Sequence, residues 1–472
     1  MATRVVVIGA DAAGMSAAHQ ALRVARRTGR SLEIVVLERT QHTSYSACGI
    51  PYWLAGDVAE GERLVARTAQ QHRDAGIDLR LGVEAVALDL AARTVTTRDV
   101  GDGSAAGTLA FDELVLATGA HARVPAWARG SDGRPVPGVR AVKTLDDGAA
   151  WIDLLLGSRE GRPPRRAVVV GGGYIGIETA EAFLRRGLET TVVTRGEIMG
   201  SLDPDMGARV RAAMVRAGVE VSCSEEADGL ERGADGRVAA VLAGGRRFEA
   251  DVVALGLGAV PSVELAAEAG LPLGAFGGLL PDERQRVADG VWAAGDCCEV
   301  LERHGPWRVY VPLGTHANKQ GRVAGENLAG GDARFEGVLG TAITRFVVGG
   351  EHVEISRTGP TRRQALAAGA VVQTLVTEST TASSYMPEAS PIAVKVAADP
   401  ASRRLIAVQI VGGPGAGKRI DTAAAAIWCG ARVDDVAQMD LAYAPPFSPV
   451  YDPVQIACRR LADLMSKQGR AE

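Results

Sequence analysis

The chain has 472 residues, a formal net charge of −4 and a sequence pI of about 6.1. That length exceeds what one hydrophobic core usually organises, so we expect two or three domains. The near-balanced charge argues against a nucleic-acid or anionic-membrane partner, and no apolar run has the length of a membrane span. Because the first residues run directly into an apolar strand, we expect no signal peptide and a cytoplasmic protein.

The N-terminal residues show the pattern of a dinucleotide-binding unit. An apolar strand over 4–8 is followed by a glycine turn, an alanine-rich helix and a second strand over 32–37, which runs into Glu38. Gly9 permits the tight turn, Gly14 permits close helix packing, and Glu38 can bond a ribose hydroxyl. Asp11 replaces the middle glycine, so the assignment depends on this context.

Cys48 follows the first unit, in the segment SYSACGIPYW over residues 44–53. We expect its thiol to open a helix, where unsatisfied N–H groups favour the thiolate, the nucleophilic form. The alternative is a small apolar core residue, a common fate of an isolated intracellular cysteine. The six cysteines contain no C-x-x-C pair, which argues against a zinc site or a disulfide framework.

The middle of the chain contains a second glycine motif. A polar helical stretch over 60–75, strands near 79–90 and 93–98, a strand over 111–116 and a linker over 129–138 are expected before it. Gly171, Gly173 and Gly176 then form a complete G-x-G-x-x-G between a strand and a helix. The next strand ends in Thr194-Arg195 without an acid. Arg195 can pair with a 2′-phosphate, which favours NADPH over NADH; alternatively, it is a solvated surface charge.

A further buried strand runs into Gly295-Asp296. An acid at this place can bind the ribityl hydroxyls of a flavin, and a helix starting near 315–317 would point its N-terminus at the flavin ring. His316 is then either a ligand or a helix cap. Because the second dinucleotide unit is inserted within the first, we expect one permanently held cofactor and one that exchanges.

The last part of the chain has no glycine motif. Strands over 392–396 and 405–411 and an apolar helix over 421–429 predict an α+β domain. The segment 443–453 contains four prolines and is therefore expected to be stiff and exposed. It is a candidate interface or an arm that completes a site, and the alternative is an ordinary surface turn.

In this order, the two glycine motifs, the segment around Cys48, Ala117-Thr118-Gly119, Gly295-Asp296 and the proline-rich segment resemble the single-cysteine branch of the pyridine nucleotide-disulfide oxidoreductases. The coenzyme A disulfide reductases and the persulfide reductases are the most similar members. The resemblance implies an α/β fold with two nested dinucleotide-binding (Rossmann-like) domains and an α+β C-terminal dimerisation domain. The FAD-binding domain would comprise residues 1–140 and 254–332, the NAD(P)H-binding domain 141–253, and the dimerisation domain 333–472.

The resemblance also assigns residues. Cys48 would be the redox cysteine, and Tyr443 and Tyr385 would reach the cysteine of the partner subunit in a homodimer. Substrate contacts would come from Ser16, Gln20, Arg23, Ser44 and Tyr451. Contacts to FAD and NADPH, with NADH as the alternative, would come from Gly9, Ala10, Ala13, Gly14, Glu38, Arg39, Ala85, Thr118, Gly119, Gly171, Gly173, Tyr174, Ile175, Gly176, Glu178, Arg195, Gly258, Gly295, Asp296 and Ala317. No metal site is implied. Ala47, Tyr451, Met386 and Glu388 depart from the family pattern and weaken the case for coenzyme A itself.

The implied activity is FAD-dependent, NAD(P)H-driven reduction of a small disulfide or persulfide through Cys48. An NAD(P)H oxidase or peroxidase acting through a Cys48 sulfenate is the first alternative, although Ala12 stands where those enzymes carry a histidine. A redox-sensing flavoprotein of low turnover is the second, and a diaphorase with a vestigial Cys48 is the third. No second cysteine lies near Cys48, which argues against a dithiol mechanism.

Overall fold

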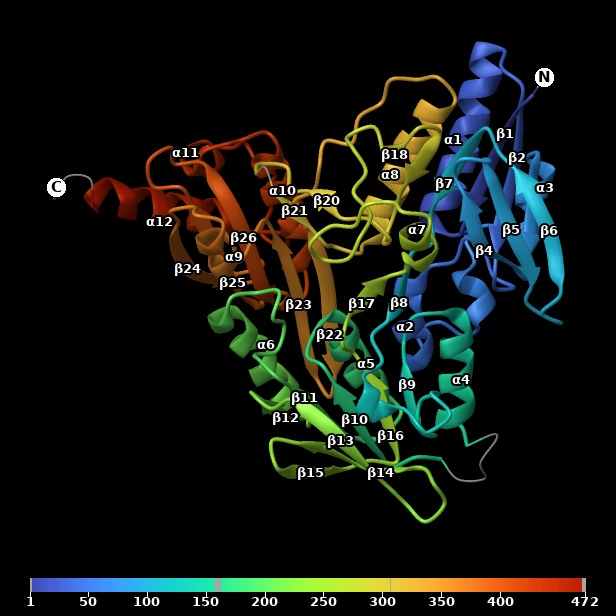
Figure 1. Cartoon of the computed structure of the whole chain (residues 1–472). Helices are drawn as coiled ribbons and strands as arrows, with labels where there is room; N and C mark the ends of the chain where they lie inside the picture. The colour runs from blue at the N-terminus through green and yellow to red at the C-terminus, as the bar shows by residue number, and fades with distance from the viewer. Residues whose placement is uncertain (1, 158–162, 306, 469–472) are drawn as a thin grey trace.

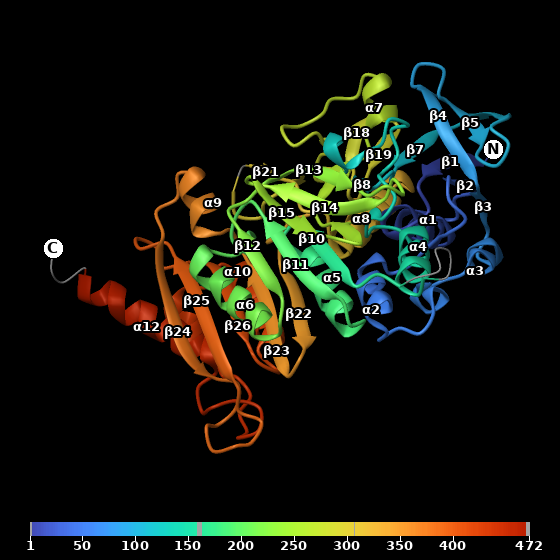
Figure 2. The same ribbon diagram turned by 90° about the horizontal axis from the view of Figure 1, so that it is seen from below.

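The structure is a computed structural model that describes residues 2–157, 163–305 and 307–468. The chain folds into three adjoining regions (Figure 1). The first is built from the N-terminal residues and a later segment, the second from the residues between them, and the third from the C-terminal part. Figure 2 shows β4 and β5 at one end of the molecule and α12 at the other. Among these residues, no helix is both long and apolar enough to cross a bilayer.

The first region is a six-stranded sheet covered on both faces. Its strand order is β18-β19-β7-β1-β2-β3, and β19, β7, β1, β2 and β3 pair in parallel. The strands are β1 (Thr3–Ile8), β2 (Leu32–Glu38), β3 (Ile77–Leu81), β7 (Glu113–Leu116), β18 (Arg286–Ala288) and β19 (Val291–Ala293). Val5 and Val7 of β1 pack toward α1 (Ala12–Thr28) and α8 (Gly314–Leu328). Val6 and Ile8 pack on the other face, toward the sheet of β4 (Val83–Asp89), β5 (Thr94–Asp99) and β6 (Ala105–Ala110) and toward α7 (Glu264–Glu268).

The predicted helical stretch over 60–75 is wrong as a single element. The chain forms the short 3-10 helix η2 (Gly61–Leu64) and then α3 (Ala69–Asp74). Val65 is extended between them, and Thr68 begins α3 with a capping box in which Gln71 participates. A side chain that bonds the backbone in this way starts a new helix rather than continuing an old one.

The second region repeats the construction of the first. Its parallel sheet has the order β12-β11-β10-β16-β9, formed by β9 (Val139–Ala141), β10 (Arg166–Val170), β11 (Glu189–Thr194), β12 (Glu220–Cys223) and β16 (Val252–Leu255). Helices α4 (Leu145–Leu155), α5 (Tyr174–Arg185) and α6 (Pro204–Arg216) cover one face. The sheet of β13 (Ala227–Arg232), β14 (Val238–Ala243) and β15 (Arg246–Glu249) covers the other. The paired strands β8 (Ala120–Ala122) and β17 (Ala259–Pro261) lie where the chain leaves and re-enters the first region. Strands β9 and β16 span the boundaries at 140/141 and 253/254, and the domain division itself stays a prediction.

The third region is an antiparallel sheet with helices. Its order is β22-β23-β26-β25-β24, formed by β22 (Ala342–Val348), β23 (Glu351–Thr358), β24 (Gln373–Thr380), β25 (Pro391–Ala398) and β26 (Leu405–Gly412). Helices α10 (Ile420–Trp428), α11 (Val433–Ala437) and α12 (Pro453–Gln468) share an apolar core with one face, and α9 (Arg362–Ala367) follows β23. The opposite face, through Ile355, Ala393 and Val411, shares a core with α5 and α6. Buried Lys395 adds ion pairs to Asp203 at 2.8 Å and Asp205 at 2.7 Å across this junction.

Candidate active site

The first glycine turn brings α1 into direct contact with the backbone of β1 and β7. A Cβ atom on Gly9 would lie 2.1 Å from the Ala117 carbonyl oxygen, and one on Gly14 would lie 1.9 Å from the Gly9 carbonyl oxygen. Gly9 also has φ +105°, a conformation that favours glycine. Glu38 is held at the end of β2, because its carboxylate accepts the Ala10 N–H at 3.0 Å and the Thr40 N–H at 2.8 Å. This is the geometry of a dinucleotide-binding turn with its ribose-binding acid.

The flavin end of this unit is built from β19 and α8. Gly295, at φ +90°, donates its N–H to Gln320 at 2.8 Å, and a Cβ on Gly295 would lie 2.9 Å from that of Ala13. Asp296 lies 3.3 Å from the Lys143 ammonium. The predicted contacts that gather here are Gly9, Ala10, Ala13, Gly14, Glu38, Thr118, Gly119, Gly295, Asp296 and Ala317. The close backbone approaches and the positioned acids fit a bound FAD, with Glu38 and Asp296 as its polar anchors.

Asp11 begins α1 where the pyrophosphate of a dinucleotide would lie. Within the described part of the chain its side chain makes no capping hydrogen bond, although it interacts with the backbone of Ala12, the first residue of α1. Burial, opposed by a backbone hydrogen bond and reinforced by the charge of Glu38, raises the pKa of Asp11 to about 6. The carboxyl group therefore takes up a proton more readily than usual, which reduces its repulsion of a phosphate.

The second glycine motif has the same close contacts. A Cβ on Gly171 would lie 2.3 Å from the Gly256 carbonyl oxygen, and one on Gly176 would lie 1.9 Å from the Gly171 carbonyl oxygen. At Gly173, by contrast, no heavy atom of the described residues comes within 4 Å of the Cβ position. Tyr174 and Ile175 open α5, and Arg195 is exposed just beyond β11. These residues fit a second nucleotide, with Gly173 beside open space.

An acid that sequence reasoning missed lies near this site. Glu197 comes three residues after β11 and receives hydrogen bonds from the Ile198 N–H at 2.9 Å and from Arg211 at 2.9 Å. The Cys223 thiol, at the end of the neighbouring strand β12, lies 3.6 Å from the same carboxylate. The end of β11 therefore carries the ion pair of Glu197 and Arg211 in addition to the charge of Arg195.

Cys48 lies in the 3-10 turn η1 (Ala47–Gly49), just before the helix α2 (Ile50–Ala55). Its thiol is accessible, yet neighbouring protein groups partly desolvate it and raise its pKa. The carboxylate of Glu178 raises it further, while the Lys143 ammonium lowers it. The predicted thiolate at a helix N-terminus is therefore wrong in this respect: α2 has only six residues and begins two positions later, and burial outweighs it.

Glu178, whose charge acts on Cys48, joins the three regions. It lies on α5, accepts a hydrogen bond from Thr344 of β22 at 2.6 Å, and is near the hydroxyl of Tyr52 on α2. Burial, the largest cause, raises the pKa of Glu178 to about 7. A carboxyl group with this pKa can be protonated or ionised near neutral pH, and its charge acts on the Cys48 thiol.

Ser44 ends a relay of hydrogen bonds that the sequence did not reveal. Its hydroxyl lies 3.0 Å from Nε2 of buried His72, Nδ1 of His72 lies 2.8 Å from Nε2 of His19, and the Arg67 guanidinium lies 2.9 Å from the same His19 nitrogen. Arginine only donates, so Nε2 of His19 must accept and Nδ1 of His72 must donate. It follows that the Ser44 hydroxyl donates to His72 and keeps its lone pairs for a ligand. Burial lowers the pKa of His72 to about 4, which keeps this ring neutral.

Comparison with known proteins identifies the family. Residues 3–321 match the family described as pyridine nucleotide-disulphide oxidoreductase, and residues 348–453 match its dimerisation domain. The chain belongs to this family. It is 35% identical over 464 residues to the NAD(P)H coenzyme A polysulfide/persulfide reductase of Pyrococcus horikoshii, covering 98% of this chain and 99% of the relative. It is 30% identical to an NADH oxidase of Methanocaldococcus jannaschii, covering 96% and 97%. The solved structure of an NAD-dependent persulfide reductase from A. fulgidus superposes with a TM-score of 0.89 at 33% identity, covering 99% of this chain and 84% of that one.

This membership confirms the predicted fold class, the oxidoreductase family and the cofactors FAD and NAD(P)H. The dimerisation domain indicates a homodimer. The roles assigned to single residues stay predictions. Three further cofactor contacts stay predictions: Arg39 is exposed just beyond Glu38 of β2, Ala85 is in β4, and Gly258 lies between β16 and β17.

The residues predicted to bind substrate fall into two places. Ser16 of α1 lies 2.8 Å from Asn318 of α8, and Gln20 contacts Glu326 of α8 and accepts a hydrogen bond from Arg23 at 2.9 Å. Ser16 and Gln20 thus lie between α1 and α8, and Ser44 contacts His72 of α3, all within the first region. Tyr451 belongs to the C-terminal region instead, where Arg459 lies 4.7 Å from its ring centroid.

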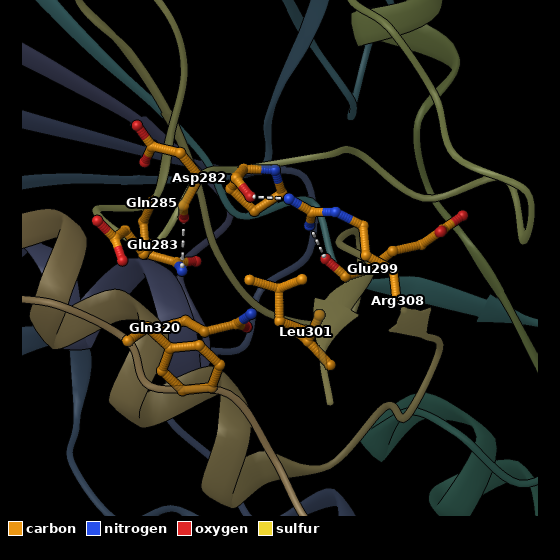
Figure 3. Close-up of a pocket in the computed structure, with 10 residues that line it drawn as sticks. Asp282, Glu283, Gln285, Glu299, Leu301, Arg308 and Gln320 are labelled. Carbon is orange, nitrogen blue, oxygen red and sulfur yellow. Dashed lines mark hydrogen bonds between the residues drawn. The ribbon is translucent and has the colours of Figure 1, made fainter. Parts of the chain in front are cut away.

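A small cavity next to α8 is structural (Figure 3). It lies between β20 (Val300–Leu301), β21 (Arg308–Val309) and α8, and has a volume of about 10 Å³. Arg308 donates to the carbonyl oxygens of Glu299 at 3.0 Å and Pro281 at 2.7 Å, which closes one side. A space of this size holds about one water-sized sphere, so it is not a substrate site. His316, whose Nδ1 lies 3.2 Å from the Val311 carbonyl oxygen, is likewise held by the local backbone.

Proposed function

We propose that this chain is an FAD-dependent NAD(P)H:disulfide oxidoreductase that reduces a small disulfide or persulfide of the coenzyme A type through Cys48. The observation that carries the proposal is the place of this cysteine. Its accessible thiol stands in the electrostatic field of Asp296 from the FAD-binding region and of Glu178 and Lys143 from the NAD(P)H-binding region. The Pyrococcus horikoshii relative, named a coenzyme A polysulfide/persulfide reductase, supports this substrate class.

When bound, FAD carries the two electrons of NAD(P)H to sulfur. The Cys48 thiolate attacks one sulfur of the substrate, a new sulfur–sulfur bond forms, and the other half of the substrate leaves as a thiolate. Two electrons then break the new bond and release the second thiolate, or sulfide from a persulfide. Lys143 favours the charged form of Cys48, and Glu178 can exchange the proton that this cycle requires.

The proposal includes a site completed across the dimer. Tyr385 and Tyr443 are 73% and 46% exposed in the single chain, as expected of side chains that a second subunit covers. In this arrangement, Tyr443 of the partner subunit would bond or protonate the leaving thiolate. Arg195 would favour NADPH. We also infer a reducing compartment such as the cytoplasm, since all six cysteines are free.

The test is the variant Cys48→Ser, assayed anaerobically with coenzyme A disulfide, coenzyme A persulfide, polysulfide and glutathione disulfide. We expect it to keep FAD and to accept electrons from NADPH, but to lose NADPH oxidation driven by these sulfur compounds. Cys429→Ser is the matched control, because Cys429 is also free and exposed but lies at the end of α10. Undiminished disulfide turnover by Cys48→Ser would refute the proposal.

The alternative is an NAD(P)H oxidase that reduces peroxide through a Cys48 sulfenate. The NADH oxidase of Methanocaldococcus jannaschii, at 30% identity, favours it, and Ala12 at the start of α1 argues against it. Both reactions need the same cysteine, so Cys48→Ser does not separate them. Comparison of peroxide with the sulfur compounds does: peroxide-dependent consumption of NADPH that far exceeds the sulfur-dependent rate would favour the oxidase.

A further inference from the structure

Two segments of the C-terminal region carry a group of exposed apolar side chains. The segment 381–390 joins β24 to β25, and the segment 442–452 precedes α12. The exposed side chains are those of Tyr385, Tyr443, Phe447, Val450 and Tyr451. In Figure 2 the corresponding orange and red loops lie together beyond the ends of β24, β25 and β26, far from α2 of the same chain. They are therefore placed to act on a second subunit rather than on their own Cys48.

The two segments are bonded to each other. The Ser383 N–H donates to the Pro445 carbonyl oxygen at 2.9 Å, and the Ser383 hydroxyl lies 3.4 Å from the Ser448 carbonyl oxygen. An open groove of about 370 Å³ nevertheless remains between them and the adjoining turn at Pro414 and Gly415. Since apolar packing does not fill this space, polar contacts determine how the segments are held.

Arg419 makes those contacts. It ends the 3-10 turn η4 (Gly417–Arg419), directly before α10, and its side chain is 12% exposed. The guanidinium donates to the carbonyl oxygens of Thr381 at 2.6 Å and Phe447 at 2.5 Å, and to the Asp452 carboxylate at 2.9 Å. It also contacts the carbonyl oxygen of Gly415. Asp452 in turn accepts the Val454 N–H at 2.9 Å, at the start of α12.

We propose that Arg419 is a positioning residue for the active site of the partner subunit, because it joins the segments of Tyr385 and Tyr443 to the rigid ends of α10 and α12. The inference rests on the proposed function, in which these tyrosines complete the partner's site. Four acceptors surround this one group: Thr381 of the first segment, Phe447 and Asp452 of the second, and Gly415 of the adjoining turn. The planar guanidinium has five donors in a fixed fork and can serve all of them, whereas a lysine ammonium presents its three donors from a single atom.

The first experiment is therefore Arg419→Lys, which keeps the charge and loses the fork. We expect disulfide-dependent NADPH oxidation to fall by about tenfold or more, since small displacements of catalytic groups have effects of this size. FAD content and reduction of the bound flavin by NADPH should stay unchanged, because these involve other parts of the chain. The variant should still dimerise, because it keeps the exposed apolar side chains of both segments. Unchanged disulfide turnover would overturn the inference, and so would an equal loss in flavin reduction.

Arg403→Lys is the matched control. Arg403 lies in the same region, is 18% exposed, and donates to both carboxylate oxygens of Asp434 at 2.7 Å and to the Ala462 carbonyl oxygen at 3.2 Å. It is thus a comparably bonded arginine on the side of α11 and α12. We expect Arg403→Lys to change disulfide turnover by less than about twofold. A loss equal to that of Arg419→Lys would mean that the effect is general loosening of the region, against the inference.

A mixed dimer tests the action across the interface. One subunit carries Cys48→Ser and the other Arg419→Gln, with different affinity tags for purification of the hybrid. One site of this hybrid combines an intact Cys48 with the intact Arg419 of the other subunit, and the second site lacks both. We expect the hybrid to show about half of the wild-type disulfide turnover, although the Cys48→Ser and Arg419→Gln homodimers are each defective. If Arg419→Gln does not fold, Arg419→Lys takes its place.

A hybrid no more active than its parents would show that Arg419 acts within its own subunit and would overturn the inference. Failure of the proposed function gives a different result: in that case the Cys48→Ser homodimer already turns over disulfide. The two failures are therefore distinguishable in one set of preparations.

Discussion

Two glycines of the second nucleotide motif, Gly173 and Gly176, allow one prediction: alanine at Gly176 should lower stability, whereas alanine at Gly173 should weaken coenzyme binding. At Gly176 a methyl group would lie 1.9 Å from the Gly171 carbonyl oxygen, where ordinary contacts begin near 3.4 Å. Helix α5 and strand β10 would have to separate by roughly 1.5 Å in a close-packed layer. At Gly173 the methyl group would meet no described protein atom within 4 Å, and φ −85° with ψ −169° suits alanine.

The expected magnitudes follow from these contacts. Gly176→Ala should lower the free energy of unfolding by about 3 kcal/mol, at the upper end of overpacking costs, because both colliding groups are backbone or directly attached to it. Gly173→Ala should leave stability unchanged or raise it by about 0.5 kcal/mol, by restricting the unfolded chain. The same methyl group would occupy the space through which the backbone approaches a pyrophosphate. Gly173→Ala should therefore raise the KM for NAD(P)H.

Urea unfolding followed by circular dichroism measures the first quantity, and reduction of the bound flavin at varied NADPH concentration measures the second. Both variants should keep FAD, because the first glycine turn is untouched. Equal stability losses in the two variants, or an unchanged KM in Gly173→Ala, would refute the reasoning from the close contacts.

Two further predictions concern the pKa of His72 and the charge of Arg195. Burial lowers the pKa of His72 to about 4 from an ordinary 6.5, so between these values the unfolded chain binds more protons than the folded one. The folded state should lose up to about 2 kcal/mol from this group between pH 7 and pH 5, and His72→Gln should abolish that part of the slope; equal pH dependence in both proteins would contradict it. Arg195→Ala should raise the KM for NADPH by about tenfold or more and leave the KM for NADH unchanged. Equal changes for the two coenzymes would identify Arg195 as a solvated surface charge.

Contacts within one short stretch of chain could be read from the sequence. Gly9, Gly14 and Glu38 lie in a single strand–helix–strand unit, and their spacing already determines that the turn, the helix packing and the ribose-binding acid come together. The same holds for Gly171 and Gly176. The stiff proline-rich segment and its exposed aromatic residues were predicted for a comparable reason, since proline restricts the backbone locally.

The properties of Cys48 could not be read in this way. Its pKa depends on desolvation and on the charge of Glu178, which lies 130 positions later in the sequence and acts on the cysteine because α2 packs against α5. A local helix signal predicted a lowered pKa, and the tertiary surroundings reversed it. Glu197 was missed because it follows its strand by three residues rather than ending it.

The sequence by itself determined the two nested nucleotide units, the family and the candidate cysteine, because these follow from glycine spacing and strand–helix order. Only the tertiary structure decided which polar groups meet: Ser44 with His72 and His19, and Arg419 with the two tyrosine-bearing segments. The physical reason is that backbone geometry is encoded over short stretches, whereas burial and hydrogen bonding between distant residues arise only when the separate elements pack together.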